Sequence, residues 1–359
     1  MACAASALCV AGCGQDGSRE GSESATGGDG GAGPTEPLRE PPSPPDGPVA
    51  DGTVITVLAV TELFIGDTDR DGTLDPEAWR ELGYDLDGRL SGASDGNQCA
   101  RLEGADPGVT EDGAGGIDNS FGRNLLTVIR LIDPRGSENI AGQIEAGRFS
   151  YLFRFDNLGT GPVQTDVDAA LYLATARDDP PLFDGTDAWP VDFDSVIDGD
   201  VESPRIVFPT SFVTNGTWAS GARTDFELIV TIGGAEMPFN VLGGVITMDL
   251  VGLDSDPTAT NGVIAGVVDT EQLVSEFRRA AAQYDSSLCS GPIIEGLVAT
   301  VRESADIMLD GTAGDPSETC NGISIGLGFN ASAAMLGEVA PADPEPPDPC
   351  AAGAGGSTG

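Results

Sequence analysis

The sequence predicts an α+β protein, mainly an antiparallel β-sandwich with two helical insertions. Short segments of alternating or continuous apolar residues recur along the chain, and this pattern is typical of strands. They outnumber the segments with helical spacing. Of the 359 residues, 51 are Gly and 25 are Pro, whereas only 6% are aromatic. A chain so rich in turn residues favours strands joined by loops over a helix bundle.

Eight segments predict strands. They cover residues 54–60, 148–158, 167–176, 205–213, 224–232, 239–251, 262–268 and 322–329. In the second segment Tyr151, Phe153 and Phe155 occupy alternate positions. Alternate side chains lie on one face of a strand, so this spacing predicts a sheet with one aromatic face buried.

The predicted helices fall into two regions. In the first, Asn119 or Ser120 can cap a helix that ends near residue 132, and Ser137 can cap a short helix after it. In the second, Asp269 begins a capping box ahead of a helix through residue 284, and another helix starts at Pro292. These regions are the two helical insertions.

Composition divides the chain into four parts. Residues 14–52 consist almost entirely of Gly, Ser, Pro and acidic residues, so they cannot bury enough apolar surface to offset the entropy of ordering. The expected parts are a signal peptide (1–12), a disordered tether (13–52), one β-rich globular domain (53–340) and a disordered tail (341–359).

The first residues predict a location outside the cytoplasm. A short apolar stretch ends in Val10-Ala11-Gly12-Cys13, which resembles the bacterial lipobox. The resemblance implies cleavage before Cys13 and lipid attachment to its thiol, and Gly14 favours the outer membrane. The alternative is an ordinary secretory signal or a disordered start. The expected location is therefore extracytoplasmic, as an outer-membrane lipoprotein or a secreted protein.

The charge excludes several classes of function. With 17 basic and 58 acidic side chains the net charge is -41, and the chain contains no His. It also contains no Lys. Nucleic acids and anionic lipid headgroups are excluded as partners because they require positive charge. Chemistry based on His or Lys is excluded as well. The expected contact with a membrane is the N-terminal lipid alone, and the expected partners are a glycan or an envelope protein.

The cysteines predict two disulfides. Cys3 and Cys9 fall in the signal peptide and Cys13 carries the lipid, which leaves an even number with no C-x-x-C pair. Those that remain are Cys99, Cys289, Cys320 and Cys350. Of the three connectivities we expect Cys289 with Cys320 and Cys99 with Cys350, because a helix and a returning loop would join the first pair. The alternative is four free buried thiols.

One acidic loop has the spacing of a calcium site. Carboxylates stand at positions 1, 3, 5 and 9 of an EF-hand-like loop, Gly72 stands at position 6 and the carbonyl of position 7 is available. The candidate ligands are Asp67, Asp69, Asp71, Thr73 and Asp75. Ala78 replaces the Glu expected at position 12. The alternative is that Asp75 caps a short helix and the other aspartates form a solvated turn.

Two further acidic turns follow. They are Asp85-Leu-Asp87-Gly88 and the segment from Asp112 to Asp118-Asn119. Either turn could complete the first site or form a second one, because hard cations gather oxygen ligands from separate loops. Taken alone, each turn resembles a helix cap.

Several strings resemble a group of uncharacterised lipoproteins from myxobacteria-type genomes. The strings are GDTDRDG with AW and GYDLDG after it, DGAGGIDNSFGRNLL, FDGTDAWPV, GVIAGVVDTEQL and CNGISIGLGF, and they cover most of residues 54–340. The resemblance implies a cell-surface location and no particular activity.

Aromatic residues among acids suggest a weaker ligand site. Trp189 follows Asp187 in an acidic loop, and Trp218 follows Asn215-Gly-Thr. An exposed indole could stack on a sugar whose hydroxyls bind carboxylates, but a core anchor is the alternative. Hydrolysis by paired carboxylates also remains open, although no catalytic residue can be singled out and a non-enzyme is favoured.

The sequence therefore predicts a cell-envelope lipoprotein with a calcium-stabilised β-sandwich and a structural or ligand-binding role. The alternative is an extracellular protein that binds or hydrolyses carbohydrate. In either case the acidic charge must be relieved by bound divalent cations or by high external salt.

Overall fold

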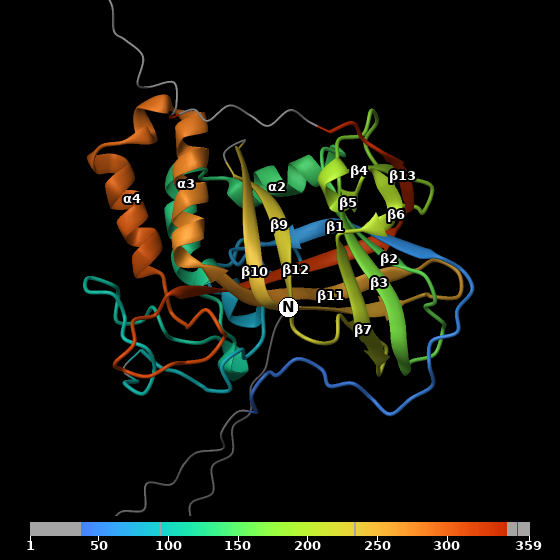
Figure 1. Cartoon of the computed structure of the whole chain (residues 1–359), viewed down its shortest axis with the longest axis horizontal. Helices are drawn as coiled ribbons and strands as arrows, with labels where there is room; N and C mark the ends of the chain where they lie inside the picture. Colours follow the sequence, from blue (N-terminus) through green and yellow to red (C-terminus); the bar gives the residue numbers. More distant parts are fainter. Residues whose placement is uncertain (1–36, 94, 233–234, 343–349, 351–359) are drawn as a thin grey trace, which may run out of the picture. The chain divides into compact units, whose positions relative to one another are not determined.

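The computed structural model describes residues 37–93, 95–232, 235–342 and Cys350. Eight of its strands form a closed barrel in which every pair is antiparallel, in the order β3-β2-β1-β12-β11-β10-β8-β7, with β7 pairing again with β3 (Figure 1). These strands are β1 (Thr56–Phe64), β2 (Ser150–Phe155), β3 (Gln164–Ala174), β7 (Ile206–Thr214), β8 (Thr217–Ala219), β10 (Ala235–Val251), β11 (Thr258–Asp269) and β12 (Gly322–Ala333).

The closed barrel corrects the expected sandwich. Each of the eight predicted segments contains a strand, but β8 was not predicted, and it is the strand that joins β10 to β7. Residue periodicity identifies which face of a strand is buried and does not identify its neighbours. Closure depends on the three residues of β8 and on the second pairing of β7, and neither has a signal in the apolar pattern.

The remaining strands lie outside the barrel. β9 (Thr224–Ile232) pairs only with β10, and β4 (Ala188–Val191) joins β3 to β13 (Met335–Val339). A small hairpin, β5 (Val196–Ile197) with β6 (Asp200–Pro204), forms a second sheet. A separate apolar cluster lies under β4 and β5 and includes Leu152, Tyr172 and Trp189. The outer face of β2 and β3 is therefore covered as well as the inner one.

Aromatic side chains fill the interior of the barrel. The Trp218 ring lies 5.9 Å from that of Phe153, 5.3 Å from Phe155 and 5.7 Å from Phe208, and Phe153 stacks on Phe329 at 5.3 Å. Rings at these separations are in contact, and a small barrel is normally filled in this way. The barrel interior is thus a packed core that positions the loops outside it.

The helices occur where the sequence predicts them. They are α1 (Leu126–Ile132) with the preceding π-turn η3 (Phe121–Leu125), α2 (Gly136–Glu145), α3 (Thr270–Tyr284) and α4 (Pro292–Glu303). Asp269 caps α3 by accepting from the backbone N–H groups of Glu271 at 2.8 Å and Gln272 at 2.9 Å. α3 and α4 pack side by side (Figure 1). Short 3₁₀ turns are η1 (Ala78–Glu81), η2 (Ala114–Gly116), η4 (Phe193–Ser195) and η5 (Ser286–Cys289).

The two expected disulfides are present, but the expected pairing was wrong. Cys99 is bonded to Cys320, and Cys289 is bonded to Cys350. After α4 the chain does not return to η5. It runs beside the loop that carries Cys99, and Ala100 forms a parallel bridge with Thr319. The spacing between Cys289 and Cys320 allows the chain to return to Cys289, but it does not determine whether the chain does so.

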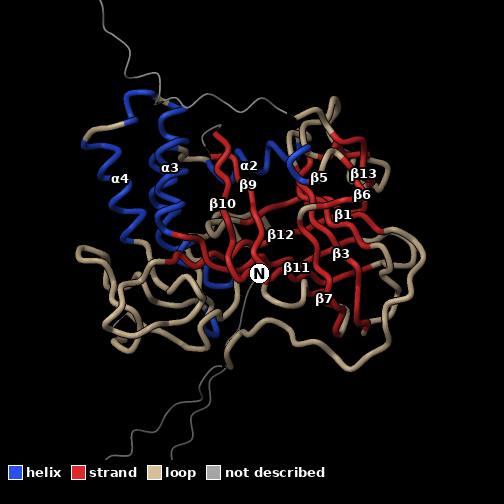
Figure 2. The backbone as a smooth tube through the Cα atoms, viewed as in Figure 1, coloured by secondary structure: helices blue, strands red, loops and turns tan. Residues whose placement is uncertain are grey.

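Loops from two distant parts of the sequence meet outside the barrel. The segment of residues 82–118 and the segment of residues 304–321 form a region with little regular structure, which Figure 2 shows as loop. Tyr84, Leu86 and Ile307 from these loops pack on Val245 and Val263 of the barrel wall. The Tyr84 hydroxyl also lies 2.8 Å from the Thr247 hydroxyl. We call this region the loop corner.

Candidate metal centre

The Asp67–Asp75 loop is a tight turn in which Asp67 and Asp69 both have hydrogen-bond partners. Asp67 accepts from the Arg130 guanidinium at 2.9 Å and from the Ser137 hydroxyl. Asp69 accepts from the backbone N–H groups of Asp71 at 3.0 Å and Thr73 at 2.8 Å. The carboxylate of this turn that is buried therefore already has a cationic partner.

The last aspartate of this turn binds the backbone just ahead of a short 3₁₀ turn. Asp75 accepts from the backbone N–H of Glu77 at 2.9 Å, and Glu77 is the residue that precedes η1. Among the residues that the structure describes, the carboxylates of this turn do not gather into a group that could hold a metal ion.

The loop corner gathers three other carboxylates. One oxygen from each of Asp85, Asp87 and Asp118 lies within 4.8 Å of the others. Asp85 and Asp87 belong to one of the two further acidic turns, and Asp118 ends the other. The structure thus joins the two turns, which the sequence placed about thirty residues apart, into one site.

In each of these carboxylates one oxygen accepts a hydrogen bond from a backbone N–H group. Asp85 Oδ1 accepts from the Gly88 N–H at 2.7 Å, Asp87 Oδ1 from the Arg89 N–H at 2.9 Å, and Asp118 Oδ2 from the Leu86 N–H at 2.7 Å. Asp85 Oδ2 is buried without any hydrogen-bond partner among the described residues. Asp85 is only 2% exposed, so water does not compensate this oxygen as it does at the surface.

Burial and mutual repulsion raise the pKa values in the loop corner. Burial and the charge of Asp85 raise the pKa of Asp87 to about 6, although Arg89 opposes the shift. Burial, followed by the neighbouring aspartates, raises the pKa of Asp118 well above its usual range. Burial also raises the pKa of Asp85. The raised pKa values reflect the free-energy cost of keeping these carboxylates ionised, and a bound cation would offset that cost.

Two more aspartates act on the same site. Burial raises the pKa of Asp112 to about 8 and that of Asp306 to about 7, and Asp87 contributes to both shifts by repulsion. Asp306 accepts from the backbone N–H of Ser324 at 2.9 Å and from its hydroxyl at 2.5 Å. The loop corner therefore concentrates five aspartates with raised pKa values, and in four of them a neighbouring aspartate contributes to the shift.

Asn119 fixes the position of the site against the barrel. Its side-chain amide donates to the carbonyl oxygens of Leu82 and Gly326, each at 2.9 Å, and its oxygen accepts from the Gly326 N–H at 3.1 Å. A Cβ at Gly326 would lie 2.1 Å from the Leu82 oxygen, so only glycine permits this approach. Asp118 is therefore held next to a residue that is bonded to β12.

The donor set suits a hard cation. All ligands are oxygens from irregular loops, and Ca²⁺ accepts six to eight oxygens in flexible geometry, whereas Mg²⁺ demands a near-ideal octahedron. The chain has no His, and the cysteines of the loop corner form a disulfide. Zinc and copper are therefore poorly matched.

The aromatic residues proposed for sugar stacking are core anchors. Trp189 and Trp218 are both 0% exposed. Asp187 forms an ion pair with Arg177 at 2.9 Å, and the Trp218 indole donates to the Ser211 hydroxyl at 2.9 Å. Neither ring offers a face to a sugar. Cys13 lies outside the described residues.

Sequence reasoning missed Asp306 entirely. It stands at the end of α4, where the apolar pattern predicts only helix, and its approach to the site depends on the path of the chain toward Cys320. Asp85, Asp87, Asp112 and Asp118 had a weak signal in their Asp-Gly turns, but nothing in the sequence ranked these turns above the Asp67–Asp75 loop.

Within the described part of the chain, no helix is long and apolar enough to cross a membrane. The disulfides indicate an oxidising, extracytoplasmic environment. Comparison of the chain with protein-family models, with curated proteins and with solved structures gave no match.

Proposed function

We propose that the protein is an extracytoplasmic domain whose loop corner binds Ca²⁺ through Asp85, Asp87 and Asp118. The observation that carries the proposal is Asp85 Oδ2, a buried carboxylate oxygen with no partner beside two further carboxylates. Such an oxygen is costly unless a cation lies against it. The bound ion would let these loops keep one conformation, which is a structural role or the support of a ligand surface.

The chemistry of the compartment favours calcium over other ions. Calcium sites in extracellular modules work at dissociation constants of about 10⁻⁴ to 10⁻³ M, and the ligands here are loop residues of that kind. The rival source of charge relief is a high concentration of salt around the acidic surface. Calcium binding is selective for one ion, whereas salt relief depends on ionic strength alone.

Thermal unfolding tests the proposal. The protein is unfolded in EDTA, in CaCl₂, in MgCl₂ and in NaCl at matched ionic strength. We expect calcium at 100 times its dissociation constant to stabilise the protein by about 2.7 kcal/mol, with magnesium much less effective. An equal response to all three salts would establish a general ionic effect and reject the site. Asp71→Asn removes one carboxylate charge, as Asp85→Asn does, but at an exposed position, so it serves as the matched control for Asp85→Asn.

We also propose that the domain is tethered to the bacterial outer membrane through a lipid on Cys13. The lipobox resemblance supports the proposal, and the oxidised cysteines agree with this compartment. Labelled palmitate should be incorporated into the protein in a bacterial host and should be lost from Cys13→Ser. Equal labelling of both proteins would place the lipid elsewhere, and absence of label from both would favour the secreted form.

A further inference from the structure

We propose that the cation site and the Cys99–Cys320 disulfide form one coupled unit. In this unit the bound cation protects the disulfide from reduction, and the disulfide holds the cation site together. The inference rests on the proposed function and adds a form of regulation to it. It predicts that the loop corner loses calcium when the disulfide is reduced.

The disulfide lies in the segment that joins the ligands. Between η1 and η2 the described residues contain no helix and no strand beyond the isolated bridge at Ala100. This segment carries Asp85 and Asp87 near its start, and Asp118 follows η2. Cys99 is near its middle, so the bond to Cys320 ties down the loop on which the site depends. An untied loop of this length has many open conformations.

Backbone hydrogen bonds align the two cysteine segments. The Cys99 N–H donates to the Ala313 oxygen at 2.7 Å, the Ala100 N–H to the Glu318 oxygen at 2.6 Å, and the Cys320 N–H to the Ala100 oxygen at 3.0 Å. The disulfide is therefore part of a short ladder between the ligand segment and the segment that leads into β12.

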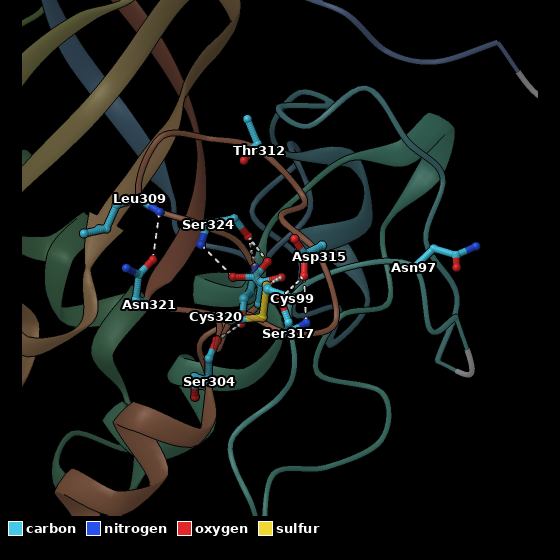
Figure 3. The surroundings of a disulfide bond; sticks show 12 residues. Asn97, Cys99, Ser304, Leu309, Thr312, Asp315, Ser317, Cys320, Asn321 and Ser324 are labelled. Carbon is cyan, nitrogen blue, oxygen red and sulfur yellow. Dashed lines mark hydrogen bonds between the residues drawn. A yellow bond between two sulfur atoms is a disulfide. The ribbon is translucent and has the colours of Figure 1, made fainter.

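The Cys99 end of the disulfide lies next to Asp306. The Cys99 sulfur lies 3.7 Å from the Asp306 carbonyl oxygen, and the Asp306 N–H donates to the Gly322 oxygen at 3.1 Å. Ser324, whose hydroxyl and N–H bind the Asp306 carboxylate, lies beside the disulfide in Figure 3. The bond thus connects Asp306, which repels the other aspartates, to the loop that carries them.

The second disulfide provides an internal comparison. Cys99 and Cys320 are 2% and 6% exposed, whereas Cys289 and Cys350 are half-buried. Cys289 ends η5, ahead of α4, and is not part of the loop corner. A reductant can reach the buried bond only after the loop corner opens locally. The five aspartates favour this opening when no cation is present, and a bound cation opposes it.

The redox step balances with a dithiol as reductant. Dithiothreitol supplies two electrons and two protons, the S–S bond of Cys99–Cys320 breaks to give two thiols, and dithiothreitol closes to its cyclic disulfide. If the closed loop binds the cation and the open loop does not, cation binding and the intact disulfide must favour each other by the same factor.

Differential alkylation measures this coupling. The oxidised full chain is treated with dithiothreitol in EDTA or in CaCl₂, free thiols are alkylated at intervals, and mass spectrometry follows each disulfide separately. Calcium at 100 times its dissociation constant should slow the reduction of Cys99–Cys320 at least about tenfold. The reduction of Cys289–Cys350 should change by less than about twofold.

Variants and calorimetry separate the inference from the proposed function. Asp85→Asn should abolish the protection, and Asp71→Asn should retain it. Isothermal titration should show about tenfold weaker calcium binding in Cys99→Ser/Cys320→Ser than in Cys289→Ser/Cys350→Ser. If the oxidised protein binds calcium but both disulfides are reduced at rates that calcium does not alter, or alters equally, the coupling is refuted. If the oxidised protein binds no calcium, the proposed function fails and the inference fails with it.

Discussion

Two acidic regions of this protein, the Asp67–Asp75 loop and the loop corner, differ in how folding compensates their buried carboxylates. In the Asp67–Asp75 loop the spacing follows a calcium-binding pattern, yet its buried carboxylate forms an ion pair with Arg130 and accepts a hydrogen bond from Ser137. In the loop corner the spacing follows no single motif, yet Asp85 Oδ2 has no partner among the described residues. The comparison shows that spacing along the chain does not reveal whether folding leaves a carboxylate oxygen without a partner.

The largest expected difference between the loops is their response to calcium. Asp85→Asn should lose the calcium stabilisation, about 2.7 kcal/mol at 100 times the dissociation constant, because a ligand is removed. Asp69→Asn should retain it. Denaturant unfolding with and without calcium measures both variants. A variant of the Asp67–Asp75 loop that loses the calcium response would reverse the comparison.

In EDTA an Asp→Asn substitution should change the free energy of unfolding in opposite directions in the Asp67–Asp75 loop and in the loop corner. Asp67→Asn should destabilise the protein by about 1–3 kcal/mol, because Arg130 loses a charged hydrogen-bond acceptor. Asp85→Asn should stabilise it by about 1 kcal/mol, because a buried carboxylate with a partnerless oxygen is removed. Urea unfolding of the metal-free proteins gives both values. Two changes of the same sign would contradict the account.

Acidification should stabilise the metal-free protein through the loop corner. The folded pKa values of Asp112, about 8, and Asp306, about 7, are raised above the ordinary value of 3.8. A raised folded pKa contributes stability that is fully present below the unfolded pKa and is lost as pH rises through the folded pKa. Stability in EDTA should therefore rise as pH falls from 8 toward 4.

The pH effect is isolated by a variant and by calcium. Asp306→Asn should show a smaller rise than the wild type, since one titrating group is gone. Saturating calcium should flatten the rise in the wild type, because the ion already neutralises the site. Identical pH profiles for wild type and variant in EDTA would show that Asp306 does not titrate with the fold.

The smallest effect is expected where a carboxylate is both paired and exposed. Glu271 on α3 forms an ion pair with Arg302 on α4 at 2.6 Å, with side chains 65% and 39% exposed. Such pairs contribute about 0.2–1 kcal/mol and weaken with salt. Glu271→Gln should destabilise the protein within this range and leave calcium binding unchanged. A loss of several kcal/mol would mean that the α3–α4 pair also supports the loop corner.

Apolar spacing was sufficient to locate most of the strands, although the predicted arrangement of those strands was wrong. Seven of the eight barrel strands were predicted from it, because their buried faces are long enough to show a period. β8 was missed because three residues show no period, although its Trp218 is the centre of the aromatic core. Closure of the barrel was missed for the same reason, because it requires β8 to pair with β7 and β7 to pair with β3.

The candidate site was less predictable than the fold. Asp85 and Asp118 were visible as acidic turns, but their meeting depends on Asn119 binding Leu82 and Gly326. The compensation of Asp67 depends on Arg130, which lies 63 residues away in the sequence. Neither contact can be predicted from the spacing of residues along the chain. The disulfide pairing was wrong for the same kind of reason, because the direction of the chain after α4 is set by packing.

Whether Ca²⁺ binds between Asp85, Asp87 and Asp118 is decided by locating the bound ion. Crystals grown with Ca²⁺, or with Tb³⁺ as an anomalous substitute, would show the ion as an isolated peak. The account predicts a peak about 2.3–2.6 Å from oxygens of Asp85, Asp87 and Asp118. A peak only among the carboxylates of the Asp67–Asp75 loop, or none at saturating ion, would contradict it.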